Sequence, residues 1–385
     1  MSSVASIVIL STLVLLLSNG ASGFNARSVL YRARGSSALS QTIRSQGTSK
    51  VVFEGIPRIP SLNTDSNLPT ENSYDGIVCD MDGVLWLGNE EISQSIDALN
   101  VLKLSGKSIV FVTNNSAKTK LDIQNKLQSL GYEASLKDII TSSSVTAEYL
   151  RKELPVKSAL SLPTKVYMIG NPALEEELTA VGFEILQVKD DEPPGMHEDE
   201  YSEVSKFDTS KVEAVVVGID YDFNYRKLAM GSMYLGRESL FVATNPDVAN
   251  RVSSGALLPE TGALINALES VSGRVATICG KPSEIIVDHV LALLKCDPSR
   301  VIMVGDRLDT DIAFANKAGV ASCLVLSGCT TIEEAQEQLE NPLDEEKTPD
   351  FIANDLWDMV SPVADATLLN LFSQSSADEE PQEFF

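Results

Sequence analysis

Four short apolar runs in this sequence are each followed directly by a group of polar residues, and this arrangement restricts the folds that the chain can adopt. Short apolar runs rich in β-branched residues favour buried strands. In open α/β sheets, binding and catalytic sites lie just beyond the carboxyl ends of strands, which is where the polar groups fall. We therefore predict an α/β fold with strands at Asp75–Cys79, Lys107–Thr113, Val275–Cys279 and Val301–Val304.

The first polar group is Asp80-Met81-Asp82-Gly83. Residues two apart in an extended chain point the same way, so Asp80 and Asp82 present two carboxylates to one cleft. Gly83 allows the chain to turn sharply after them. One carboxylate can attack a substrate while the other handles a proton. Such a tetrapeptide alone is usually a solvated turn, but the apolar strand in front of it favours the catalytic interpretation.

The second polar group, Thr113-Asn114-Asn115-Ser116, offers hydroxyl and amide donors. Neutral donors of this kind suit a phosphoryl group, whose oxygens accept several hydrogen bonds. The spacing of Lys118–Leu130 predicts a helix whose free N-terminal N–H groups add to the same binding site. The alternative interpretation is an ordinary turn and helix N-cap.

The last two polar groups supply a cation and several carboxylates. Lys281 follows the third run, where it would neutralise a nucleophile and a bound phosphate. Asp306, Asp309 and Asp311 lie within six residues after the fourth run, and so many carboxylates at one strand end require a counter-ion. Mg²⁺ prefers oxygen ligands and bridges to phosphate, so we predict Mg²⁺ here. The ligand ladder of an EF-hand calcium loop, which ends in Glu, is absent from this stretch.

The order of the four groups, D-x-D-G, T-N-N-S, G-K-P-S and G-D-R-L-D-T-D, resembles the haloacid dehalogenase superfamily. The motifs are most similar to its branch of phosphoglycolate phosphatase, pyridoxal phosphatase and 4-nitrophenyl phosphatase. The resemblance runs from about Tyr74 to about Asp358. It implies a Rossmann-like parallel-sheet core of the haloacid dehalogenase type, an inserted α/β cap domain, and the activity of a phosphoric monoester hydrolase.

By this resemblance, Asp80 is the nucleophile that becomes phosphorylated. Asp82 protonates the leaving oxygen and then activates the hydrolytic water. The resemblance assigns substrate and phosphoryl contacts to Thr113, Asn114, Asn115 and Lys281. It implies Mg²⁺ as the cofactor, bound by the Asp80 carboxylate, the backbone carbonyl of Asp82, Asp306 and, through a water molecule, Asp311.

A stretch of 167 residues separates Thr113 from Lys281, far more than one strand crossover needs. Alternating strand and helix patterns in this stretch predict a second small α/β unit, matching the cap of the family. The resemblance places Asn250 and Arg251 near the substrate, where Arg251 would pair with a substrate carboxylate; a surface arginine is an equally good interpretation. The predicted cap elements are Lys165–Ile169, Pro172–Val181, Val212–Val217, Tyr225–Leu235 and Leu240–Ala243.

These patterns predict the domain limits. A charged cap loop at 190–206 holds seven acidic residues and is interpreted as solvated. The predicted segments are a signal peptide at 1–23, a plastid transit-like segment at 24–55, core domain at 72–158 and 275–370, cap domain at 159–274, and an acidic tail at 371–385.

The first 53 residues contain five basic residues and no Asp or Glu. Within them, Ile7–Leu17 is an apolar run of 11 residues, too short to span a bilayer, and small residues precede Phe24. The Ser- and Arg-rich stretch after Phe24 is like a transit peptide, and the combination resembles the bipartite presequence of algal plastids. We therefore predict the plastid stroma; a secreted protein with a disordered N-terminus is the alternative.

The chain carries 54 acidic and 30 basic residues, for a formal net charge of −24. Such a surface repels nucleic acid and anionic membranes, so we predict neither as a partner of the mature protein. It also repels a phosphate ester, so a phosphate site needs a local cation or oriented N–H groups. Five cysteines without C-x-x-C spacing and only two histidines favour free thiols in a reducing compartment over zinc or disulfides.

We expect the substrate to be a small phosphorylated metabolite. The family branch and the plastid-like presequence favour 2-phosphoglycolate, hydrolysed to glycolate in photorespiration. Pyridoxal phosphate, a nucleotide or a sugar phosphate is the alternative, because small differences in cap contacts can change substrate preference. A non-catalytic phosphate-binding scaffold is disfavoured, since none of the motif residues is missing. Relatives often dimerise through the cap, so by analogy we expect a homodimer.

Overall fold

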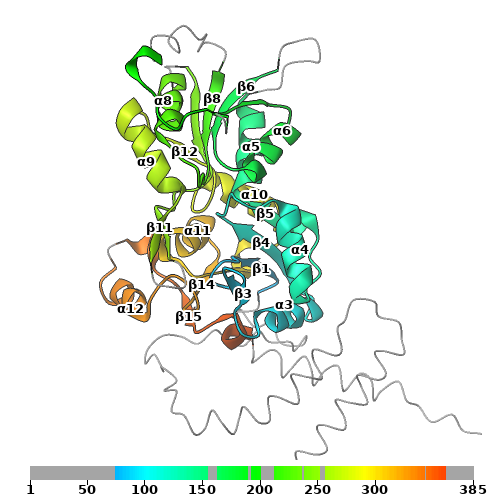
Figure 1. The fold of residues 1–385 in the computed structure, drawn as a ribbon. Helices are drawn as coiled ribbons and strands as arrows, with labels where there is room; N and C mark the ends of the chain where they lie inside the picture. The colour runs from blue at the N-terminus through cyan, green and yellow to red at the C-terminus, as the bar shows by residue number, and fades with distance from the viewer. Residues whose placement is uncertain are drawn as a thin grey trace, which may run out of the picture.

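The computed structural model describes residues 74–154, 163–189, 192–200, 212–235, 238–251, 256–342 and 344–360. The predicted signal peptide, transit-like segment and acidic tail lie outside these residues, as do parts of the acidic loop at 190–206. The described chain forms two parallel sheets, one above the other in Figure 1, each flanked by helices. Within it, no helix has the length and apolar character needed to cross a membrane.

The lower sheet in Figure 1 has six strands, and every neighbouring pair is parallel. β1 lies between β13 and β4 and pairs with both along its whole length. Because the carboxyl ends of these three strands meet at one edge, the residues that follow them come together there. The strand order is β15 (Phe351–Ala353), β14 (Ala321–Val325), β13 (Val301–Gly305), β1 (Gly76–Cys79), β4 (Ser108–Thr113) and β5 (Ile139–Thr141).

Both faces of this sheet are apolar, since alternate strand residues point to opposite faces. On one face, Ile77 and Phe111 share an apolar cluster with two helices, α3 and α4. On the other, Val78 and Val110 share a cluster with three helices, α5, α10 and α11. The bounds are α3 (Ser95–Leu104), α4 (Lys120–Leu130), α5 (Ser142–Glu153), α10 (Glu284–Leu294) and α11 (Ala313–Ala318).

The upper sheet has five strands, again all parallel. Helices α8 and α9 pack on one face, and α6 packs on the other beside α5. The strand order is β12 (Thr277–Ile278), β9 (Leu240–Ala243), β8 (Val212–Val217), β6 (Lys165–Ile169) and β7 (Glu184–Leu186), and the helices are α6 (Pro172–Ala180), α8 (Tyr225–Tyr234) and α9 (Thr261–Ser272).

Two short hairpins accompany the two large sheets. The hairpin of β2 (Trp86–Leu87) and β3 (Glu90–Glu91) follows β1, and the hairpin of β10 (Ala249–Arg251) and β11 (Leu257–Pro259) follows β9. Both contribute residues to the cleft at the carboxyl edge of the lower sheet. A last helix, α12 (Ile332–Glu340), lies between β14 and β15 in the chain.

The predicted α/β class and the parallel core are confirmed, and the three predicted cap strands have their expected bounds. The two cap helices end one residue earlier than predicted, at Ala180 and Tyr234.

The strand predicted at Val275–Cys279 needs a correction. It is the two-residue strand β12, and it pairs with β9 of the upper sheet instead of joining the core. The reason is that β1 already has β13 and β4 on its two sides, whereas the edge of β9 is open. The predicted boundary at residue 275 therefore falls inside the upper sheet.

The helix predicted at Lys118–Leu130 begins two residues later, at Lys120. The Thr119 side chain accepts the Asp122 N–H, and the Asp122 carboxylate accepts the Thr119 N–H, which forms a capping box. Thr119 is therefore the N-cap of α4, and Lys118 lies before the helix. The Lys118 side chain lines a cleft that is described below.

Candidate active site

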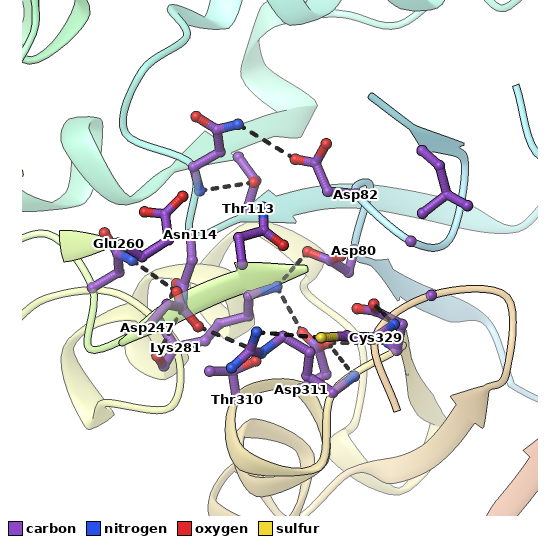
Figure 2. Close-up of a pocket in the computed structure, with 18 of the residues that line it drawn as sticks. Asp80, Asp82, Thr113, Asn114, Asp247, Glu260, Lys281, Thr310, Asp311 and Cys329 are labelled. Carbon is purple, nitrogen blue, oxygen red and sulfur yellow. Dashed lines mark hydrogen bonds and ion pairs between the residues drawn. The ribbon is translucent and has the colours of Figure 1, made fainter. Parts of the chain in front are cut away.

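The carboxyl edge of the lower sheet gathers four polar segments (Figure 2). β1 leads into Asp80, β4 ends at Thr113, and β13 leads into Asp306. The fourth segment, with Lys281, comes from the turn after β12 of the upper sheet. The site is therefore assembled from both sheets.

Lys281 lies between two carboxylates at the centre of this site (Figure 2). Its Nζ is 2.5 Å from Asp80 Oδ1 and 2.7 Å from Asp311 Oδ1, and it donates a third hydrogen bond to the Val112 carbonyl at 3.2 Å. The lysine side chain is only 2% exposed, so all three ammonium protons are used within the protein.

Burial and charge shift the pKa values here in a consistent way. Burial raises the pKa of Asp80 well above its ordinary value, and the neighbouring Asp311 and Asp306 carboxylates add to this, while Lys281 opposes it. Burial alone would lower the pKa of Lys281, but Asp311 and Asp80 raise it above its ordinary value. The ammonium is thus held charged, and it cannot by itself neutralise three carboxylates.

Asp80, Asp306 and Asp311 are buried, and each offers an oxygen within 4.8 Å of the others. Burial, followed by the charge of Asp311, raises the pKa of Asp306 to about 7. Hard oxygen ligands in this number and spacing fit a divalent cation such as Mg²⁺, whose charge would stabilise the ionised carboxylates.

The backbone packs closely around Asp306. Its Oδ2 accepts a hydrogen bond from the Cys329 N–H at 2.6 Å. A Cβ on Gly83 would lie 2.2 Å from this same oxygen, and a Cβ on Gly328 would lie 2.0 Å from it. Gly83 also has a φ of 88°, in the region that favours glycine. Only residues without a side chain fit at these two positions.

Asp311 uses both of its carboxylate oxygens within the protein. Oδ1 accepts from Lys281, and Oδ2 accepts the N–H groups of Asp306 and Arg307, each at 3.1 Å. Asp311 therefore orients Lys281 and the Asp306 loop, and its remaining lone pairs suit a water-mediated contact with a metal better than a direct one.

Asp82 has a different environment from Asp80. Its Oδ1 accepts a hydrogen bond from the indole Nε1–H of Trp86 at 2.9 Å, and its Oδ2 lies 3.5 Å from Asn115 Nδ2. Asn115 is itself fixed, because its backbone N–H donates to Thr113 Oγ1 at 3.0 Å. The carboxyl group of Asp82 is thus oriented without being tied to the lysine.

Asn114 joins the two sheets at the site. Its side-chain oxygen accepts the Lys281 N–H at 2.8 Å, and its Nδ2 donates to the Lys281 carbonyl at 3.1 Å and to Asp247 Oδ2 at 2.9 Å. Asn114 therefore positions Lys281 and the loop after β9, and it has fewer donors left for a phosphoryl group than the sequence suggested.

The cleft formed by these segments has a volume of about 280 Å³. It brings together nearly all of the predicted site residues, including Asn250 from the β10–β11 hairpin. The side chain of Arg251 lies outside the described part of the chain. The predicted residues that line the cleft are Asp80, Asp82, Thr113, Asn114, Asn115, Asn250, Lys281, Asp306 and Asp311.

Several further residues line the cleft that the motifs did not identify as site residues, among them the charged or aromatic Trp86, Asp247, Glu260 and Arg307. Arg307 pairs with Asp247, with Nε 3.5 Å from Oδ1, and with Asp309. The polar residues that directly follow the predicted strand Leu240–Ala243 were a usable signal for Asp247, because they repeat the pattern of an apolar run followed by polar groups. Nothing local marks Glu260, because its place in the cleft depends on how α9 packs.

Comparison with known proteins extends this picture. Residues 77–184 match the family model described as haloacid dehalogenase-like hydrolase, and residues 278–359 match a second model described as HAD-hydrolase-like. The glycerol-3-phosphate phosphatase of Gallus gallus is 36% identical over 298 residues, which cover 76% of this chain and 93% of that protein. The chloroplastic phosphoglycolate phosphatase 1A of Arabidopsis thaliana is 34% identical over 305 residues, which cover 76% and 78%.

A solved structure is also similar over the same region. The glycerol phosphate phosphatase from Mycobacterium tuberculosis in complex with magnesium superposes with a TM-score of 0.60 at 26% identity. The match covers 76% of this chain and 78% of that one. Phosphatases with at least two different named substrates therefore share this fold.

Proposed function

Because this chain belongs to the haloacid dehalogenase-like hydrolase family and is a phosphoric monoester hydrolase, we propose that it converts 2-phosphoglycolate to glycolate and phosphate. The reaction would proceed through a phosphorylated Asp80, with Mg²⁺ as the cofactor. The observation that carries the proposal is the buried Asp80 held by Lys281 beside Asp306 and Asp311.

In the first half-reaction, an oxygen of the Asp80 carboxylate attacks phosphorus as the bond to the leaving oxygen breaks. Asp82 gives its proton to that oxygen, so the alcohol departs and Asp82 becomes a carboxylate. In the second, Asp82 takes a proton from water, whose oxygen attacks phosphorus and breaks the bond to Asp80. Phosphate leaves, and both aspartates return to their starting states.

The other residues of the cleft position these groups and balance charge. Lys281 fixes one Asp80 oxygen at 2.5 Å and supplies the positive charge that a dianionic phosphoryl group needs in a chain of net charge −24. Thr113 and Asn115 would donate to phosphoryl oxygens. Mg²⁺, when bound, supplies further charge neutralisation; the Asp80 carboxylate, the Asp82 carbonyl and Asp306 would hold it directly and Asp311 through water.

The choice of substrate rests on two separate supports. One relative is named a chloroplastic phosphoglycolate phosphatase, and the N-terminal composition favours import into a plastid, where we propose that the enzyme works. The fold itself does not discriminate between alcohols, because similar proteins are named for different substrates. Glycerol 3-phosphate is the second candidate, because the relative of that name is as similar in sequence.

The test is steady-state hydrolysis of 2-phosphoglycolate, glycerol 3-phosphate and pyridoxal 5′-phosphate by the full mature enzyme, with Mg²⁺ and after its removal by chelation. We expect the highest kcat/KM for 2-phosphoglycolate and loss of activity without the metal. A higher kcat/KM for either other ester would refute the substrate, and full activity in chelator would refute the cofactor.

The nucleophile is tested separately with Asp80→Asn. We expect kcat to fall by roughly 10³-fold or more, because the neutral amide cannot form the phosphoenzyme. The far-UV circular dichroism spectrum should stay that of the wild type. Substantial turnover in a folded Asp80→Asn protein would exclude Asp80 as the attacking group.

A further inference from the structure

A second cleft adjoins the catalytic one, with a volume of about 620 Å³. It lies between the β2–β3 hairpin and the start of α4, and Asn250 of the β10–β11 hairpin contributes to it. The two clefts share a wall formed by Asp82, Trp86, Leu87, Gly88, Thr113, Asn115 and Asn250.

The shared wall indicates where the leaving group of a substrate goes. In the proposed reaction the phosphoryl group lies at Asp80, and the leaving oxygen must reach Asp82 to receive its proton. Asp80 lines only the catalytic cleft, whereas Asp82 lines both. The part of the alcohol beyond the leaving oxygen therefore has the second cleft in front of it.

The cations that line the two clefts differ in whether protein carboxylates pair with them. Lys281 is used by Asp80 and Asp311, and Arg307 is used by Asp247 and Asp309. Those two cations are paired with protein carboxylates and line only the catalytic cleft, so an anionic group on the alcohol, in the second cleft, needs another partner. Among the described side chains, the other cations on these walls are Lys118 and Lys126.

Lys126 has partners of its own. Its Nζ donates to the Gly88 carbonyl at 2.7 Å and lies 3.8 Å from the centre of the Trp86 ring. Lys118 is exposed and makes no hydrogen bond or ion pair with any described residue; the pKa of Asp122 is lowered chiefly by hydrogen bonds from Thr119 and in smaller part by the charge of Lys118. The nearby Asp122 carboxylate accepts from the Thr119 N–H and hydroxyl, at 3.0 Å and 2.8 Å, so it is held in the helix cap.

We propose that the second cleft is the leaving-group site and that Lys118 selects phosphate monoesters whose alcohol carries an anionic group. This rests on the proposed phosphatase reaction and deepens it by naming the class of substrate. The anionic group is a carboxylate, as in 2-phosphoglycolate, or a second phosphate. A cation is the group that such a substrate needs, because the rest of the chain repels it.

The experiment measures kcat/KM with three esters in the metal-loaded enzyme: 2-phosphoglycolate for a carboxylate, fructose 1,6-bisphosphate for a second phosphate, and glycerol 3-phosphate for a neutral alcohol. The variants are Lys118→Gln and Lys118→Glu. Lys120→Gln is the matched control, because it removes an equal charge two residues away. Lys120 lines neither cleft, and its charge is felt by Glu177 and His289, whose pKa values it lowers.

We expect Lys118→Gln to lower the ratio of kcat/KM for 2-phosphoglycolate to that for glycerol 3-phosphate about tenfold, the effect of one partly solvated charged hydrogen bond. Lys118→Glu should lower it further, and added salt should reduce the difference between wild type and variant. Lys120→Gln should change the ratio less than twofold. The ester whose ratio to glycerol 3-phosphate falls most identifies the anionic group.

An equal loss for all three esters in Lys118→Gln, or an equal change in Lys120→Gln, would overturn the role of Lys118. This outcome is distinct from failure of the proposed substrate. If the wild-type enzyme prefers glycerol 3-phosphate, 2-phosphoglycolate is refuted as the physiological substrate, while the charge-specific response of the Lys118 variants still decides the present proposal.

Discussion

Two aspartates separated by one residue have different surroundings, and this difference suits them to different tasks. Asp80 is 6% exposed, and its bond to Lys281 holds one carboxyl oxygen in place. Asp82 instead accepts from the Trp86 indole, over which the Lys126 ammonium lies. A cation on the ring makes the indole N–H a stronger donor, so Trp86 is a positioning residue for the proposed acid.

Replacing Trp86 with Phe tests this role. We expect kcat/KM for glycerol 3-phosphate to fall about tenfold or more, because an alkoxide needs the proton of a well-placed Asp82. The value for 4-nitrophenyl phosphate, whose phenolate leaves without a proton, should fall much less. The equivalent change at Trp357, which packs against the same apolar cluster but lines neither cleft, is the control. Equal losses for both esters would show that Trp86 only packs in the fold and does not position Asp82 for proton transfer.

The surroundings of Glu260 make the stability of the fold depend on pH. Burial, with the charges of Asp247 and Asp82, raises its pKa to about 7, although its carboxylate accepts the Thr261 N–H. The folded protein therefore binds this proton more tightly than the unfolded chain does. Between about pH 4.5 and pH 7, the contribution of Glu260 to the free energy of unfolding decreases as pH rises.

Glu260→Gln removes this ionisation. The wild type loses stability as Glu260 ionises, and the variant does not. We therefore expect the free energy of unfolding of the variant minus that of the wild type to increase by about 1–2 kcal/mol from pH 5 to pH 8, after allowance for partial exposure. Urea unfolding of both magnesium-loaded proteins at the two pH values measures it. A difference between the proteins that stays constant with pH would show that Glu260 titrates normally.

At the scale of elements, the loop after β13 owes its shape to a single π-helical turn, η4 (Leu308–Ile312). The N–H groups of both Asp311 and Ile312 bond to the Arg307 carbonyl, each at 3.1 Å. This turn directs Asp311 back over Gly305, where a Cβ would lie 2.2 Å from that of Asp311. Because β13, η4 and Gly328 approach one another closely, the side chains of Asp306 and Asp311 are confined to the positions they occupy.

Gly328→Ala tests the packing around the metal ligands. A Cβ there would lie 2.0 Å from Asp306 Oδ2, so the carboxylate must move. We expect Mg²⁺ affinity to weaken about 10–100-fold, as for changes to groups that orient a ligand. The measurement is the rise in melting temperature as magnesium is added; at about 100 times Kd, binding stabilises the wild type by about 2.7 kcal/mol.

The control is Gly195→Ala, since a Cβ there would meet nothing within 4 Å. Its melting temperature should respond to magnesium as that of the wild type does. A wild-type magnesium response in Gly328→Ala would show that Asp306 is not a ligand or that its loop adapts freely.

At the scale of the whole molecule, one apolar cluster runs through both sheets. It includes Val78 and Val110 of the lower sheet and Val166 and Val216 of the upper sheet, with residues of α5 between them. Asn114 and Lys281 add polar bonds across the same junction. A junction with a continuous apolar core couples the two parts, unlike the polar contacts between loosely tethered domains.

We therefore expect the two sheets to unfold in one cooperative transition. Differential scanning calorimetry of the magnesium-loaded protein should show a single peak whose calorimetric and van't Hoff enthalpies agree. The same should hold in the metal-free protein at a lower temperature. Two separated peaks in either state would show that the sheets are independent folding units.

The three central core strands β1, β4 and β13, and the residues after them, were predictable, because apolar runs and the polar groups after them are local patterns. Asp80, Asp82, Thr113, Lys281 and Asp306 reach one cleft as expected. The role of Asn114 was not predictable, since its bonds to Lys281 and Asp247 join positions more than 130 residues apart in the chain.

The sequence alone determined the α/β class, the family and the chemical groups of the site, since these depend on residue types and their order. Only the tertiary structure decided that β12 belongs to the upper sheet, that Asp311 faces Lys281, and that Lys118 lies on a second cleft. These features depend on which distant segments pack together, and free energies of packing are summed over the whole fold and not encoded in any local pattern.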